Sequence, residues 1–172
     1  MSTLTIRDAD GEEHKFKTKY LEKVLMLKQM LEDVGVTEET YDTAQVIPIG
    51  TISTETITTI LKWLDLHESE PPKSEEEKTL NRLSRAVSEE DNKLFDAITD
   101  RKKLAAVINA AYYLEARDLI DTLIKYTANQ LEGKSAEEMC AWMGVAPRNE
   151  RNREAEEDAA VANGTSAKRE KN

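Results

Sequence analysis

Few residues in this chain have the types and spacing that catalysis or metal binding needs. The two histidines, His14 and His67, fall on separate predicted elements, and the single cysteine, Cys140, is far from both in the sequence. A metal site needs clustered ligands, and a nucleophilic cysteine needs a base beside it. The sequence has neither a G-x-G-x-x-G nor a G-x-x-x-x-G-K-[ST] phosphate-binding loop. We therefore expect a protein that is not an enzyme and that holds no metal or cofactor.

The composition indicates an acidic protein. The 172 residues carry a net charge of -10, and 34% of them are charged. Such a surface repels phosphate backbones and anionic lipid, so we expect neither nucleic-acid nor membrane binding. The first residues lack the basic and apolar regions of a signal peptide, and no apolar run approaches the roughly 20 residues that span a bilayer. We expect the protein in the cytoplasm and nucleus, where Cys140 stays reduced.

The N-terminal part of the chain predicts a small sheet covered by helices, which is an α/β fold. Apolar residues alternate on both sides of the turn signal at residues 10–11, so a β-hairpin is predicted there. Its inward residues are Leu4, Ile6 and Phe16. Residues 46–49 predict a third strand, placed at an edge because Pro48 has no backbone donor. Helical periodicity predicts helices over residues 20–33 and 54–67.

The pattern changes to an acidic loop after residue 67. Residues 68–92 contain two consecutive prolines and three consecutive glutamates, which are typical of a flexible, solvated segment. Leu80, Leu83 and Val87 suggest a short helix within it. The predicted organisation is a domain over 1–114 that includes this loop, a helical segment over 115–145, and a polar, disordered tail over 146–172.

Three helices are predicted in the C-terminal part of the ordered chain, and all three keep an apolar stripe. The first covers residues 101–114, with Asp100 as its N-cap, and the second covers residues 117–132. The third begins at Ser135, which has a glutamate three residues later as in a capping box. Because the polar tail has little with which to cover these stripes, we expect them to bind a protein partner. Tyr112 and Tyr113 strengthen that expectation, since tyrosines anchor interfaces well.

Several short motifs, taken in order, resemble one known family. Residues 30–35 read M-L-E-D-V-G, Trp63 is followed by Pro71-Pro72, and residues 110–114 read A-A-Y-Y-L. Ala128-Asn129 is then followed by a G-K-S-A-E-E stretch. Their joint order and spacing resemble the Skp adaptor subunit of SCF ubiquitin ligases, over about residues 3–145.

The resemblance implies a BTB/POZ-type domain with C-terminal F-box-binding helices. It implies a non-catalytic adaptor that links an F-box substrate receptor to a cullin scaffold and promotes substrate ubiquitination. The implied cullin contacts are Pro48, Ile49, Tyr112 and Tyr113. The implied F-box contacts are Leu123, Thr127, Leu131, Met139, Trp142, Met143 and Val145.

Departures from the family pattern leave alternatives open. Tyr112 stands where the family usually has asparagine, and the family's C-terminal acidic segment is replaced here by the polar tail from Pro147. One alternative is a structural protein that self-associates through the same helices, and an adaptor without its F-box partner is also expected to form a weak homodimer there. Another is an elongin C-like or channel-tetramerisation BTB protein, although the helices after Leu114 argue against elongin C.

Overall fold

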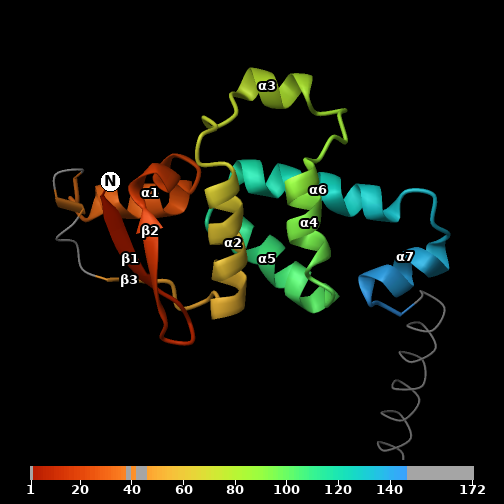
Figure 1. The fold of residues 1–172 in the computed structure, drawn as a ribbon, viewed down its shortest axis with the longest axis horizontal. Coiled ribbons are helices and arrows are strands. Elements are labelled where there is room, and N and C mark those ends of the chain that lie inside the picture. Colours follow the sequence, from red (N-terminus) through yellow and green to blue (C-terminus); the bar gives the residue numbers. More distant parts are fainter. Residues whose placement is uncertain (1, 38–39, 42–45, 147–172) are drawn as a thin grey trace, which may run out of the picture. The chain divides into compact units, whose positions relative to one another are not determined.

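A three-stranded sheet forms the N-terminal end of the structure (Figure 1). Strand β1 (Thr3–Arg7) pairs antiparallel with β2 (Glu13–Lys17) and parallel with β3 (Ile47–Pro48), giving the order β2-β1-β3. The predicted hairpin and the predicted edge position of Pro48 are confirmed. An edge suits proline because its missing N–H faces no partner strand.

The computed structural model describes residues 2–37, 40–41 and 46–146, which belong to two compact units. The first unit runs to Gln130 and the second starts at Leu131, and each is described by itself. The predicted polar tail lies, apart from residue 146, outside the described residues.

Asp8 organises the turn of the hairpin. Its carboxylate accepts hydrogen bonds from the backbone N–H groups of Asp10 and Glu12, from the Thr54 hydroxyl and from the His14 ring. Burial alone would raise the pKa of Asp8, but these hydrogen bonds together hold it well below its usual range. His14 therefore has a structural partner in the turn.

The predicted helix over residues 20–33 is divided in two. A 3-10 helix, η1 (Thr18–Glu22), precedes α1 (Leu25–Asp33), and Val24 between them has φ -119° and ψ 81°, outside the helical region. The break lets both Leu21 and Val24 reach the core, where they are 4% and 0% exposed. Burial of these two side chains in the tertiary structure sets the break at Val24, and helical periodicity in the sequence does not predict it.

Helix α1 ends as predicted at Gly35, which has φ +73°. The backbone N–H of Val36 donates to Leu31 O and that of Gly35 donates to Glu32 O, which is the Schellman pattern.

Helices α2 (Thr54–Leu66), α4 (Glu89–Asp96) and α5 (Arg101–Tyr113) pack together beside the sheet (Figure 1). Asp100 caps α5 as predicted, through the backbone N–H of Lys102. Trp63 on α2 and Phe95 on α4 are 2% and 0% exposed, so aromatic side chains from both helices are fully buried. Helix α6 (Arg117–Leu131) follows α5 after a turn at Glu115, and α7 (Ala136–Met143) belongs to the second unit.

The acidic segment after α2 contains more structure than the sequence predicts. Helix α3 (Glu75–Leu80) begins at Ser74 with a capping box completed by Glu77, and α4 begins inside the predicted loop, at Glu89. The short helix suggested by Leu80, Leu83 and Val87 therefore lies earlier in the chain. Leu80 is 82% and Leu83 is 94% exposed, so the N-terminal cap and not an apolar stripe sets its position.

Candidate partner-binding surfaces

The end of α5 and the loop after β3 form the first candidate surface. They line a shallow hollow of about 340 Å³. Its residues are Thr51, Ile52, Ser53, Thr56, Ala106, Asn109, Ala110 and Tyr113. Tyr112 and Tyr113 are 55% and 48% exposed, which confirms that both rings reach the surface. The fold thus brings the loop after the third strand next to Tyr113, as a single binding surface requires.

The two predicted contacts on the third strand differ in exposure. Pro48 is exposed, whereas Ile49 is only 2% exposed and packs in the core. Successive side chains of an extended chain point to opposite faces, so two neighbours cannot both face a partner. The structure therefore places Ile49 in the core and leaves Pro48 accessible.

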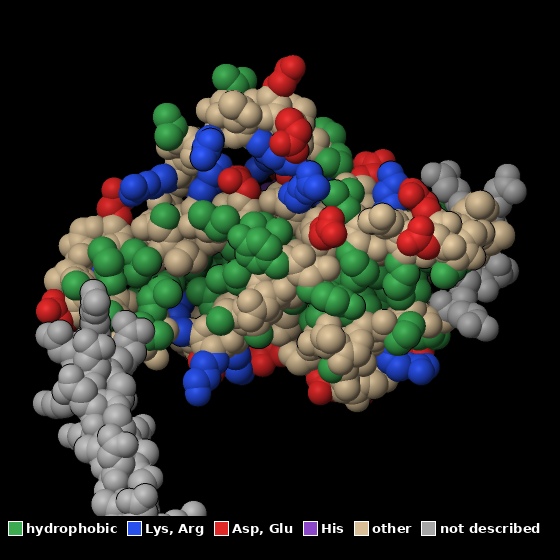
Figure 2. Space-filling view, turned by 180° about the vertical axis from the view of Figure 1, so that it is seen from behind, with side chains coloured by type: hydrophobic (Ala, Val, Ile, Leu, Met, Phe, Trp, Pro, Cys, Tyr) green, Lys and Arg blue, Asp and Glu red, His purple; other side chains and the backbone are tan. Residues whose placement is uncertain are grey.

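Helix α6 provides the second candidate surface, because it carries two apolar rows. The inner row, Leu119, Leu123 and Tyr126, is buried at 0%, 1% and 1% exposure. The outer row, Ile120, Ile124 and Thr127, is displaced by one residue and lies partly at the surface, with Ile124 55% exposed. Leu131, at the last residue of the helix, continues the outer row in register and is half-buried. In the view from behind, hydrophobic side chains gather over the middle of the molecule (Figure 2).

Leu123, which the sequence predicts as a partner contact, therefore packs in the core of the first unit. Its phase along α6 matches Leu119 and Tyr126, at steps of four and three residues, and these three share one helix face. The single apolar stripe predicted from the sequence contains both rows. Ile124 belongs to that stripe but is absent from the predicted contacts, and it is the exposed residue. The two rows could have been told apart in the sequence, because the outer row starts at Ile120, one residue after the inner row.

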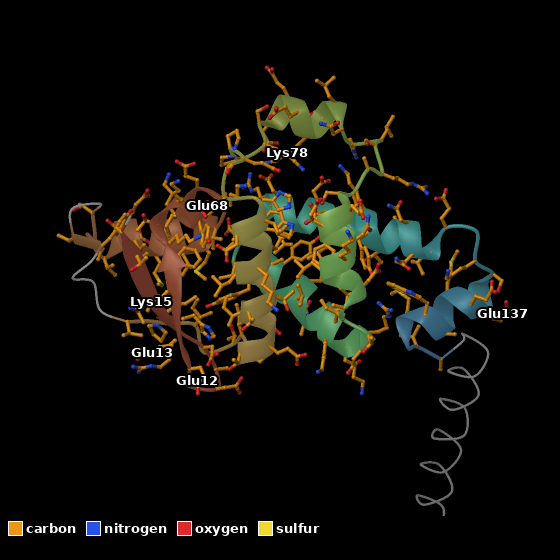
Figure 3. All side chains as sticks on the ribbon, viewed as in Figure 1. Glu12, Glu13, Lys15, Glu68, Lys78 and Glu137 are labelled. Carbon is orange, nitrogen blue, oxygen red and sulfur yellow. The ribbon has the colours of Figure 1, made fainter. Side chains whose placement is uncertain are left out.

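A third side of α6 is polar and holds the acidic segment. The Asp118 carboxylate accepts the backbone N–H of Lys73 at 3.1 Å, and its Oδ1 lies 3.9 Å from Lys78 Nζ (Figure 3 labels Lys78). Eleven residues along the helix, the Asn129 side-chain amide donates to the carbonyl of Arg85 at 2.9 Å. The acidic segment thus lies along the polar side and leaves the outer row uncovered.

Helix α7 in the second unit presents an apolar side of its own. Ser135 and Glu138 form the predicted capping box, and Gly144 ends the helix with φ 68°. No residue of α7 is buried. Met139, Met143 and Val145 are 36%, 46% and 46% exposed, and Trp142 is half-buried.

The described part of the chain shows no arrangement for metal binding. No group of three or more histidine, cysteine or acidic residues in it is placed to hold a metal ion. Cys140 is a free, half-buried thiol on α7. The described residues also include no helix that is both long enough and apolar enough to cross a bilayer.

Comparison with known proteins agrees with the sequence resemblance. No family model matches the chain. An E3 ubiquitin ligase complex SCF subunit sconC from Arthroderma otae is 30% identical over 139 residues, which are 80% of this chain and 79% of the relative. The SCF subunit sconC of Aspergillus terreus is 30% identical over 137 residues, 80% of each chain. Suppressor of kinetochore protein 1 from Schizosaccharomyces pombe is 29% identical over 140 residues, 81% of this chain and 83% of the relative. The chain therefore belongs to the Skp-type family of SCF ubiquitin ligase adaptor subunits.

Proposed function

We propose that this protein links an F-box substrate receptor to a cullin scaffold in an SCF-type E3 ubiquitin ligase. It promotes ubiquitination of the receptor's substrate and carries out no chemistry itself. Its relatives are named as subunits of such a complex. The observation that carries the proposal is the presence of two separate surfaces on consecutive helices. One is the α5 hollow with the exposed Tyr112 and Tyr113 beside it, and the other is the outer row of α6 with the exposed Ile124. An adaptor needs two separate surfaces so that both partners bind at once.

The cullin is assigned to the first surface. Tyr113 stands at the edge of the hollow, with Tyr112 and Pro48 exposed as further contacts. A tyrosine that is half-exposed in the free protein buries a large apolar ring on binding and keeps its hydroxyl at the rim. On this proposal the sheet and helices of residues 1–114 form the BTB/POZ-type domain, working in the cytoplasm and nucleus.

The F-box helices are assigned to the helical segment over 115–145. Ile124 and Thr127 on α6 are accessible anchors, and Leu131 continues their row. In the second unit the anchors are Met139, Trp142, Met143 and Val145. Without an F-box partner the same side chains allow the weak homodimer, which an F-box domain is expected to dissociate.

The mechanism is geometric. Holding a substrate receptor and the cullin-bound conjugating machinery in one assembly makes ubiquitin transfer effectively intramolecular. The adaptor therefore acts through the effective concentration it sets and needs no catalytic residue.

Size-exclusion chromatography with light scattering tests this proposal. The protein is run alone, then with an F-box domain, then with an F-box domain and a cullin N-terminal domain. We expect a 1:1:1 complex, with any homodimer dissociating as the F-box domain is added. A stable homo-oligomer that ignores both partners would instead favour the self-associating structural protein.

Two variants assign the surfaces. Tyr113→Lys should weaken cullin binding at least about tenfold and leave F-box affinity unchanged, while Ile124→Glu should do the converse. Leu83→Lys and Leu80→Glu are matched controls, because they make the same changes at apolar side chains exposed elsewhere. Loss of both affinities in either surface variant, with the fold intact by circular dichroism, would show that the two surfaces are wrongly assigned.

A further inference from the structure

The two ends of the acidic segment meet at one histidine. His67 is the C-cap residue of α2, immediately before the segment of residues 68–92 begins, and α4 starts within the last residues of that segment, at Glu89. The His67 Nδ1 atom lies 2.9 Å from Glu70 Oε2, and its Nε2 atom lies 2.9 Å from Asp91 Oδ1 on α4. His67 thus joins the first turn of the segment to the helix at its far end.

With both carboxylates ionised, this geometry favours the imidazolium form of the ring. An ionised carboxylate only accepts hydrogen bonds, so a ring nitrogen facing one must donate. Neutral imidazole has one N–H, whereas the imidazolium has two. Only protonated His67 satisfies both carboxylates.

The surroundings make the proton important for stability. The side chains of His67 and Asp91 are 14% and 4% exposed, and the His67 ring packs on Trp63 at 4.5 Å between centroids. A neutral ring can keep its one N–H on Nε2, which faces the buried Asp91, so loss of the proton removes the donor to Glu70. Glu70 is 58% exposed and is then solvated by water.

Lys23 is the other charged group that contacts His67. It comes from the end of η1, and its Nζ donates to the His67 carbonyl and lies 5.8 Å from the Trp63 ring centroid. Burial lowers the pKa of Lys23, and the carboxylates of Glu70 and Asp118 oppose that shift. Because Lys23 binds the His67 carbonyl, it fixes the end of α2. The Asp91 carboxylate is therefore neutralised by the His67 ring and not by Lys23.

The charge balance favours the protonated ring. The hydrogen bond to Asp91 raises the pKa of His67 above 6.5, burial opposes this, and the hydrogen bond to Glu70 adds to it. A group whose pKa is raised by folding stabilises the folded state below its unfolded pKa, and this contribution is lost as pH rises through the folded pKa. The sensitive window therefore begins near pH 6.5 and extends upward.

We propose that His67, Glu70 and Asp91 form a proton-controlled latch that closes the acidic segment on the body of the protein. Protonated, the latch holds the segment's first turn to α4. When His67 is deprotonated, the latch releases the first turn of the segment, and the segment is then held only by its other contacts. These include the ion pair of Glu68 with Lys17 (2.6 Å; Figure 3 labels Glu68) and the contacts of Lys73, Lys78 and Arg85 with α6. The segment along the polar side of α6 is therefore more open at alkaline pH.

A proton NMR titration of the full-length protein tests the latch first. The sequence has two histidines, and His14 is a natural control because its ring bonds one carboxylate, Asp8, in the hairpin. The signal that disappears in His67→Gln should titrate above pH 6.5 in the wild-type protein, and Glu70→Gln should lower its midpoint. A midpoint at or below 6.5 would contradict the latch.

Hydrogen exchange with mass spectrometry tests the opening itself. Exchange rates are first corrected for their intrinsic pH dependence. As pH rises from 6.5 through the pKa of folded His67, peptides from residues 67–92 should then lose protection. The expected loss is about tenfold for each unit by which the pKa of His67 in the folded state exceeds that in the unfolded state. Hairpin peptides should not change, and His67→Gln should abolish the pH dependence whereas His14→Gln should keep it. Unchanged protection in the wild-type protein, or the same pH dependence in His67→Gln, would overturn the proposal. Glu70→Gln, at an exposed site, gives an independent reading if His67→Gln does not fold.

Discussion

Leu123 and Ile124 are neighbours on α6, and both are large and apolar, but Leu123 is 1% exposed and Ile124 is 55% exposed. The inner row to which Leu123 belongs packs in the core of the first unit, and the outer row lies partly at the surface. A helix that only needed to fold would bury one row and expose polar residues elsewhere. The second row is therefore apolar surface in excess of what this fold requires, which is where a partner is expected.

The largest expected difference between the rows is in stability. Leu123→Ala should lower the free energy of unfolding by about 2–5 kcal/mol, because it leaves a cavity in a closed core. Ile124→Ala should change it by less than about 0.5 kcal/mol, because its side chain is already hydrated. Urea unfolding monitored by circular dichroism measures both. Similar losses in the two variants would remove the distinction between the rows.

The polar side of α6 is a third case beside the inner and outer rows. It is covered by the acidic segment, which it holds through hydrogen bonds and not through apolar packing. Asp118 is 7% exposed and accepts the backbone N–H of Lys73. Asp118→Asn should cost about 1–3 kcal/mol, since it weakens a charge-assisted bond to a buried carboxylate. Thermal unfolding gives the cost, and Asp121→Asn, one turn away and more exposed, is its control. An equal effect at Asp121 would argue against the anchoring of the acidic segment at Asp118.

The inner row contains one polar atom whose titration can be followed. Tyr126 donates its hydroxyl proton to Asp96 at 2.8 Å, and burial together with this hydrogen bond raises its pKa from 10.0 to about 12. The raised pKa means that stability is retained below pH 10 and lost between about 10 and 12, as the unfolded tyrosine ionises first. Tyr126→Phe should cost about 1 kcal/mol at neutral pH and should reduce the alkaline loss. Denaturant midpoints measured across this range test both, and an unchanged alkaline slope would contradict the burial of the hydroxyl.

The smallest effect is expected for an ion pair within α6. Lys125 Nζ lies 2.8 Å from Asp121 Oδ2, at i,i+4 spacing. The Lys125 side chain is only 12% exposed, so Lys125→Met keeps its buried aliphatic part and removes the charge. It should change the free energy of unfolding by less than about 0.5 kcal/mol, because such helical pairs contribute little. A larger loss in urea unfolding would mean that the ion pair itself is strong.

Much of the fold was predictable from local rules. The hairpin with Leu4, Ile6 and Phe16 inward, the edge position of Pro48, and the caps at Asp100 and Ser135 all follow from short-range preferences, and all are confirmed. The family also followed from motif order. The break before α1 did not, because the burial of Leu21 and Val24 decides it.

Local preferences and composition were enough to predict the main elements, the caps, the acidic charge and the surplus of apolar residues in the C-terminal helices. Packing between elements sets which of these residues are available to a partner, since it buries Ile49 and Leu123 in the core and leaves Ile124 and Tyr113 at the surface. It also brought His67 against Asp91, 24 residues away. The physical reason is that periodicity reports a residue's direction relative to its own element, whereas burial and charge pairing depend on which other elements pack against that face.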